Sequence, residues 1–415
     1  MALIKKIPFS PRLWAAAFIA NCLPTVQAIP MSFPKDREEI QLDLVGLLTV
    51  IGEAAMTIHS QTITVSWLCY LPRILPAPQA FLQPVRPIRL PPNMNVTTVG
   101  VYSGNVRRHL NFLPALLHDI DTHPALSIHE VTVTKSKDQD VKARYFSPLG
   151  VLTMLGVTVS LGLVIAAIML GDPVAIMAVS LLSLTSTLTG IGSSWKIKLA
   201  ERLAKRDVPP GDVLMKSGNG AFILARCEEK IARELYFGQE ECDYRLDTFW
   251  FRMCAGTGTF TLMAAVVALA NCKWWMQASI GLTYITMNSF YWFAAVLPPR
   301  LSWDLDMYEI TPVKDNEQCE TYTEAVSKLI KITKTAKWCS IGDMVPTTSA
   351  WNKWVDEADE NVDNEDWDGC KRLSELLKMS PGELARTNYD LEAQESTSKC
   401  GCVCRVSRHS SHDGM

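Results

Sequence analysis

The chain has 415 residues, of which 48% are hydrophobic, and its formal net charge is −3 at pH 7. So small a charge, with no basic stripe of interleaved aromatic residues, argues against a nucleic-acid partner. The twelve cysteines are scattered without regular spacing, which argues against a secreted disulfide framework. Apolar blocks alternate with blocks of ordinary soluble composition, so the lipid bilayer is the first partner that the sequence predicts.

The N-terminus has the pattern of a targeting segment. Lys5 and Lys6 precede an apolar core at 13–23, and a triplet of mostly small residues ends at Ala28. We therefore predict a signal-like segment over 1–28 that is cleaved after Ala28. An uncleaved anchor helix is the alternative.

The first membrane region is predicted at 42–71, with one span inside it. This region contains Glu53 and His59, and an ionisable group at membrane depth is by default a candidate functional residue. Coupling to protons or ions is one interpretation of this pair. The other is that both residues lie in the membrane interface beside a shorter span, because the later spans offer no charged partner.

Residues 72–147 are predicted to form a small cytosolic insertion. Several prolines end the preceding span. A β-branched run at 96–102 and an alternating run at 127–135 predict strands, and 105–120 between them predicts a helix. The expected order of this insertion is β-α-β.

Two transmembrane hairpins are predicted at 148–195 and 254–297. Each is long enough to cross a bilayer twice, since one span needs about 20 mostly apolar residues. Their only charged residues are Asp172 and Lys273, which fall at the expected turns. The short turns require the two helices of each hairpin to be antiparallel neighbours.

The loop between the hairpins, 196–253, is predicted to contain a basic amphipathic helix and a compact module. The helix is expected at 196–206, where basic residues and leucines occupy opposite faces. A Gly-Asn-Gly turn between two short apolar runs predicts a β-hairpin. A helical pattern at 228–237 completes a β-β-α order.

The segment 298–380 is predicted to be a cytosolic tail, partly helical and acidic. A strand is expected at 305–313 and a helix at 321–338, and eight carboxylates follow in the thirteen residues 356–368. A partial calcium-loop match begins at Asn364 in this run, but an acidic solvated linker is the simpler interpretation.

The last segment, 381–415, is predicted to be disordered and rich in cysteine. Cys400, Cys402 and Cys404 lie beside basic residues, so we consider them candidates for palmitoylation, which would hold the tail at the inner leaflet. An unmodified tail is the second possibility. Zinc binding is the third, although the C-x-C-x-C spacing is not the usual one.

Basic residues near the span ends predict which parts of the chain face the cytosol. The cluster at 196–206 places the central loop there, and Lys142 and Arg144 place the region before the first hairpin on the same side. The predicted fold class is therefore an α-helical multi-pass membrane protein. It has about five transmembrane helices, two tight helical hairpins and small α+β cytosolic modules. The protein is expected in the plasma membrane or an endomembrane, with its C-terminus in the cytosol. The sequon at Asn95 is then expected to be unmodified.

Three short segments carry a resemblance to a protein family. Asn219-Gly220-Ala221-Phe222, the stretch 232–237 and Glu240-Glu241-Cys242 resemble multi-pass membrane proteins of filamentous fungi for which no activity is established. The resemblance extends from about residue 40 to about residue 370. It implies that the spans and the cytosolic modules form one recurrent unit, and it assigns no functional residue.

The function predicted is that of a non-enzymatic membrane scaffold or sensor that presents cytosolic modules to protein partners or to a second copy of the chain. A small-molecule or ion transporter or channel using Glu53 and polar residues of the bundle is the alternative. An enzyme is the third hypothesis, since His109, His118, His123 and His129 lie in one histidine-rich region, but surface or core histidines explain this region more simply. No cofactor, metal or catalytic residue is predicted.

Overall fold

The computed structural model describes residues 53–136, 141–200, 210–314 and 316–379. The contacts divide the chain into two compact units. Unit 1 comprises Met1–Arg86, Arg144–Ser194 and Tyr244–Pro298, and unit 2 comprises Pro87–Ala143, Trp195–Asp243 and Pro299–Met415. Each unit therefore combines three separate stretches of sequence. The predicted signal-like segment at 1–28 lies outside the described residues.

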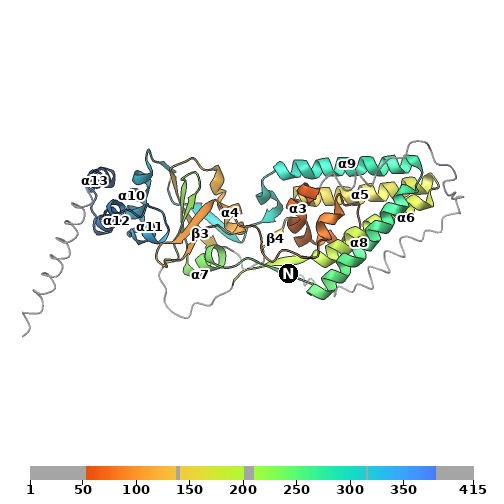
Figure 1. Cartoon of the computed structure of the whole chain (residues 1–415), viewed down its shortest axis with the longest axis horizontal. Coiled ribbons are helices and arrows are strands. Elements are labelled where there is room, and N and C mark those ends of the chain that lie inside the picture. The colour runs from red at the N-terminus through yellow and green to blue at the C-terminus, as the bar shows by residue number, and fades with distance from the viewer. Residues whose placement is uncertain (1–52, 137–140, 201–209, 315, 380–415) are drawn as a thin grey trace, which may run out of the picture. The chain divides into compact units, whose positions relative to one another are not determined.

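Unit 1 is helical (Figure 1). Its helices are α3 (Glu53–Val65), α5 (Pro148–Met169), α6 (Pro173–Ser193), α8 (Thr248–Ala270) and α9 (Trp274–Val296). Ser147 and Asp172 cap α5 and α6, and each of these helices has proline at its first position, where the missing N–H costs nothing.

The turns of the two predicted hairpins are joined to each other. Asp172 is fully buried, and its Oδ1 accepts hydrogen bonds from the amides of Val174 and Ala175 at 3.1 and 3.0 Å. Its Oδ2 accepts one from the amide of Lys273 at 2.7 Å. Lys273 Nζ in turn donates to the carbonyl oxygen of Leu170 at 2.8 Å. Both turns therefore lie at the same end of unit 1.

A buried segment without α-helical structure packs among these helices. It contains two short 3-10 helices, η1 (Trp67–Tyr70) and η2 (Pro78–Phe81), and residues 73–77 between them are all buried. Gly190 of α6 permits the close approach, because a Cβ there would lie 2.0 Å from the carbonyl oxygen of Cys69. The helix α3 ends at Val65, before the first proline at Pro72, and the proline-rich chain that follows belongs to unit 1 as far as Arg86.

Three helices, α5, α6 and α8, are long and apolar enough to cross a membrane. The helix α9 has 23 residues but carries Gln277, Asn288 and several tryptophans and tyrosines, and so falls outside this group. The described helix α3 has 13 residues, about 20 Å of rise, which is too short to span. The count of about five transmembrane helices is therefore not supported by the described residues.

Unit 2 contains a seven-stranded sheet. The order is β10-β3-β7-β6-β1-β2, and β11 also pairs with β3. Only the pair β3 and β7 is parallel; the other pairings are antiparallel. The strands are β1 (Val96–Gly100), β2 (Val106–Arg107), β3 (Ser127–Lys135), β6 (Val213–Ser217), β7 (Phe222–Arg226), β10 (Tyr308–Pro312) and β11 (Glu317–Gln318).

This sheet overturns the predicted fold class. The description as an α-helical multi-pass membrane protein with small α+β modules is wrong, because the described chain has a mixed α/β fold with a seven-stranded sheet. The strands β1 and β3 and the hairpin β6–β7 lie where the sequence predicts them. However, they join strands from the tail in one sheet, instead of forming separate modules. Long-range pairing of this kind leaves no local signal.

Helices cover the sheet and complete its core (Figure 1). A layer of α10 (Tyr322–Thr333), α11 (Lys337–Ile341), α12 (Ser349–Glu360) and α13 (Gly369–Leu376) packs on one side through fully buried tryptophans such as Trp338. The other elements of unit 2 are α4 (Phe112–His118), α7 (Glu229–Ile231), the π-helix η4 (Ala232–Phe237), two 3-10 helices and the short strand pairs β4–β9 and β5–β8. Their bounds are Ile120–Thr122 for η3, Pro299–Ser302 for η5, Lys142–Ala143 for β4, Trp303–Asp304 for β9, Trp195–Lys198 for β5 and Glu241–Tyr244 for β8.

The strand β5 replaces the start of the predicted amphipathic helix. Its four residues alternate between buried and exposed, with Trp195 and Ile197 inside and Lys196 and Lys198 outside. This period of two is that of a strand. The rest of the predicted helix, 201–206, lies outside the described residues.

Candidate functional site

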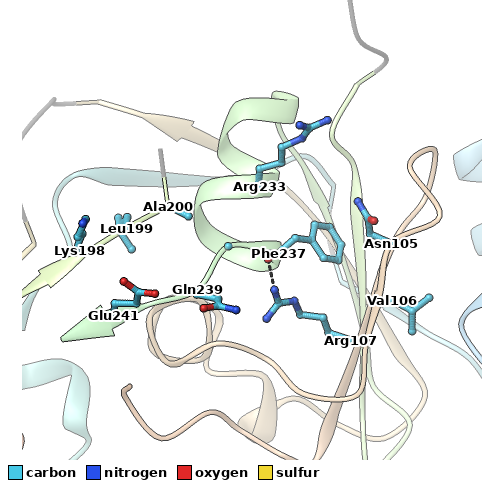
Figure 2. Close-up of a pocket in the computed structure, with 11 residues that line it drawn as sticks. Asn105, Val106, Arg107, Lys198, Leu199, Ala200, Arg233, Phe237, Gln239 and Glu241 are labelled. Atoms are coloured by element: carbon cyan, nitrogen blue, oxygen red, sulfur yellow. Dashed lines mark hydrogen bonds between the residues drawn. The ribbon is translucent and has the colours of Figure 1, made fainter. Parts of the chain in front are cut away.

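A large cleft of unit 2 lies beside the π-helix (Figure 2). It encloses about 980 Å³. Its walls come from β2, β5, β8 and the C-terminal end of η4. The lining residues are Asn105, Val106, Arg107, Lys198, Leu199, Ala200, Arg233, Phe237, Gly238, Gln239 and Glu241.

Most of the charged groups that line this cleft are basic, and we therefore call it the cationic cleft. Arg107, Lys198 and Arg233 line it, against the single carboxylate of Glu241. Arg89 lies close by, and its Nη2 donates to Oε1 of Gln239 at 2.8 Å. Burial and the charge of Arg89 lower the pKa of Arg107, so the like charges are close enough to oppose each other.

Two of the three cations have structural contacts as well. Arg107 Nη2 donates to the carbonyl oxygen of Phe237, which ends the π-helix, and Figure 2 shows this bond as a dashed line. A cation at a helix C-terminus is favoured by the helix dipole. Arg233 pairs with Glu229 one turn earlier in the same segment. Lys198 is on the exposed face of β5.

The turn after the π-helix is held by side chains from α4 and its flank. Asn111 Nδ2 donates to the carbonyl oxygens of Leu235 and Gly238, both at 2.9 Å. Gly238 permits this turn, because a Cβ there would lie 2.5 Å from the carbonyl oxygen of Arg233. A π-helical turn is rare and is frequently found at functional sites.

Glu240, next to the cleft residues Gln239 and Glu241, is buried at the start of α4. Its carboxylate accepts hydrogen bonds from the amides of Phe112 and Leu113 at 2.9 and 3.0 Å. Burial raises the pKa of this carboxyl to about 7, although both hydrogen bonds favour the charged form. Glu240 therefore links the turn that forms the cleft to α4.

The chemistry that this cleft supports is anion binding. Arginine guanidinium and lysine ammonium groups donate charge-assisted hydrogen bonds to phosphate and carboxylate oxygens. Excess positive charge in a concave site also concentrates anions. No nucleophile with an adjacent base is present among the residues that line it.

Glu53 and His59, the predicted intramembrane pair, lie on different faces of α3. Glu53 is exposed at the first described position, and His59 is buried. His59 Nε2 lies 3.1 Å from the carbonyl oxygen of Tyr291, so this nitrogen carries the hydrogen and donates it. The structure does not bring the two side chains together.

The predicted lipidation candidates Cys400, Cys402 and Cys404 lie outside the described residues, and palmitoylation there stays a prediction. The described part of the acidic run does not form a calcium loop. Asp368 caps α13 by accepting from the amides of Cys370 and Lys371. No group of three or more metal-binding side chains occurs in the described chain.

Three of the four histidines in the histidine-rich region are close together. The rings of His123 and His129 have centroids 3.9 Å apart. His118 Nε2 lies 2.6 Å from the hydroxyl oxygen of Tyr236, and burial, aided by the charge of His123, lowers the pKa of His118 to about 3. His109 is separate and lies near the cations of the cleft, since Arg107 and Arg89 help to lower its pKa.

Sequence analysis did not identify Arg73, the buried cation of unit 1. Its side chain is 2% exposed, and its Nη1 donates to the carbonyl oxygens of Leu68 and Leu71. Its Nε has no hydrogen-bond partner among the described residues. The sequence signal that could have identified Arg73 as a buried cation is that it is the lone charged residue within the apolar stretch 67–78.

No protein-family model, curated protein or solved structure matches this chain. The resemblance to membrane proteins of filamentous fungi therefore stays a prediction.

Proposed function

We propose that the chain is a membrane-associated, non-enzymatic sensor or scaffold in which unit 1 is the anchor and unit 2 is the binding module. The observation that carries this proposal is the coexistence of three helices that are apolar enough to cross a membrane with a separately packed α/β unit. The cationic cleft gives unit 2 a site at which an anionic ligand can be sensed.

The outward side chains of unit 1 support the anchoring role. Large apolar residues are exposed along the apolar helices, among them Leu161 and Ile165 of α5 and Phe260 of α8. The buried face of α9 instead carries polar groups such as Asn288. Apolar residues outside and polar residues inside suit a hydrocarbon surround.

Extraction of cell membranes at pH 11 tests the anchoring. The full chain is expected to stay in the membrane pellet and to be released by detergent. A matched variant, Leu161→Arg with Ile165→Arg, places two charges on the exposed face of α5 and should lower the pelleted fraction, because each charge costs about 3 kcal/mol at the membrane centre. Release of the unmodified chain at pH 11 would contradict membrane anchoring.

A small-molecule or ion transporter is the second candidate, and buried polar groups of unit 1 favour it. Arg73 and Asn288 are both buried, and each has a polar atom without a hydrogen-bond partner among the described residues. Ion flux into proteoliposomes containing the full chain, lost in Asn288→Leu and Glu53→Gln, would favour transport over sensing.

A further inference from the structure

We propose that the cationic cleft of unit 2 binds the phosphate groups of a phosphorylated ligand, and that this ligand is the headgroup of an anionic membrane lipid. The phosphate specificity rests on the cleft itself. The lipid source rests on the proposed function, since it requires unit 1 to be in a membrane.

Phosphate is the anion that best fits these walls. Three cations from three different elements, Arg107 of β2, Lys198 of β5 and Arg233 of η4, line separate parts of a cleft of about 980 Å³ (Figure 2). This volume is large for a single small anion and suits a headgroup-sized ligand. Phosphate oxygens can bond to several cations at once, whereas a carboxylate has only two oxygens.

The amides and polar side chains of the cleft fit the same ligand. Asn105 and Gln239 line it beside the cations, so hydroxyl groups of a sugar or inositol ring would find both donors and acceptors. Glu241 can accept a hydrogen bond from such a hydroxyl group, while the net positive charge of the walls is kept. A purely inorganic anion would leave these groups unused.

The covalent chain argues for a ligand at the membrane surface. Lys198 lies five residues after Ser193, the end of the apolar helix α6, and an extended chain of that length reaches at most about 17 Å. Glu241 lies seven residues before Thr248, the start of the apolar helix α8, a reach of about 24 Å. Two walls of the cleft are thus tethered next to helices that can end at a headgroup layer.

Equilibrium binding to the full chain in detergent tests the proposal. The probes are a short-chain phosphatidylinositol bisphosphate, the free inositol trisphosphate, inorganic phosphate and a short-chain phosphatidylserine. We expect saturable binding of the phosphorylated inositol lipid, at least tenfold tighter than that of phosphatidylserine. The variant Lys198→Gln should weaken this binding about fivefold, the effect of one cation near a phosphate.

Lys196→Gln is the matched control. Lys196 is on the exposed face of the same strand β5 but does not line the cleft. Its Nζ lies 3.8 Å from Oδ2 of Asp243. Its removal should change the affinity by less than about twofold. Equal losses in both variants would show unspecific charge attraction and would overturn the site, as would the absence of saturable binding to all phosphorylated probes.

The probes also separate the two sources of phosphate. Binding of the lipid at least as tight as that of free inositol trisphosphate supports the membrane headgroup, and tighter binding of the free trisphosphate overturns the lipid source while the phosphate site stands. Binding that persists in a chain released from membranes at pH 11 would refute the membrane anchor alone. The two proposals can therefore fail separately.

Discussion

Glu240 is a carboxyl group whose burial opposes its ionisation. Two backbone amides stabilise its charged form, but desolvation outweighs them and raises its pKa from 4.5 to about 7. Below pH 4.5 the carboxyl is protonated in both the folded and the unfolded chain. Between pH 4.5 and 7 the folded chain retains a proton that the unfolded chain has lost, so the contribution of Glu240 to stability falls as the pH rises.

Because of Glu240, we expect the stability of the folded chain to depend on pH with the opposite sign to that caused by a salt-bridged carboxylate. From pH 5 to pH 8, Glu240 should lower the free energy of unfolding by about 2.5 kcal/mol, and Glu240→Gln should remove this component because an amide does not titrate. Urea unfolding of the full chain in detergent, monitored through hydrogen exchange at the amides of β6 and β7, measures the change in the free energy of unfolding between the two pH values. The exposed Glu320→Gln is the control. An unchanged pH slope in Glu240→Gln would contradict the prediction.

At the scale of elements, the hairpins of unit 1 depend on the contacts between their turns. Asp172 is the only described side chain that caps α6, and it also holds the turn before α9 through the amide of Lys273. Asp172→Asn places an N–H group against one of these donors. We expect the free energy of unfolding to fall by about 1–3 kcal/mol, the cost of leaving a buried donor unsatisfied.

Two measurements check this prediction on the full chain in detergent. Thermal unfolding should shift to lower temperature in Asp172→Asn, while the exposed Asp366→Asn should leave it unchanged. Cys272 is buried in the turn beside Lys273, so its labelling by a maleimide, located by mass spectrometry, should accelerate in Asp172→Asn. Slow labelling at the original rate would show that the turns stay joined without this carboxylate.

The same elements show what the sequence could and could not predict. Locally encoded features are present: the two charges at the turns, the strand β3 at 127–135, and the β6–β7 hairpin around Gly220, which has φ of +86°. The parallel pairing of β3 with β7 depends on residues about 90 positions apart, and no local pattern encodes it. For the same reason the cleft was not predicted, since Arg107, Lys198 and Arg233 come from separate stretches of the chain.

At the scale of the whole molecule, the contacts between the turns show at which end of unit 1 its four long helices connect to the rest of the chain. Both turns lie at one end of the helices, because Lys273 contacts Asp172 and Leu170. The other ends of α5, α6, α8 and α9, next to residues 144, 194, 244 and 298, therefore lie at the opposite end, where the chain passes into unit 2. If unit 1 crosses a membrane as proposed, a single folded sheet requires this arrangement, since strands on opposite sides of a membrane could not pair.

This arrangement predicts that the C-terminus and Asn95 are on the same side of the membrane, and basic residues near the helix ends favour the cytosol as that side. In sealed vesicles, with the cytosolic face outward, added protease should remove a C-terminal tag from the full chain. Asn95 lies beside β1 and is exposed, so it would accept a glycan if it faced the lumen, and treatment with an endoglycosidase should leave the mobility of the chain unchanged. The variant Thr97→Ala removes the sequon and serves as the reference for mobility.

A protected tag together with a glycan at Asn95 would reverse the orientation but keep both groups on one side. A digested tag with a glycan at Asn95 would contradict the single folded sheet, because β1 and β10 would then lie on opposite sides of the membrane.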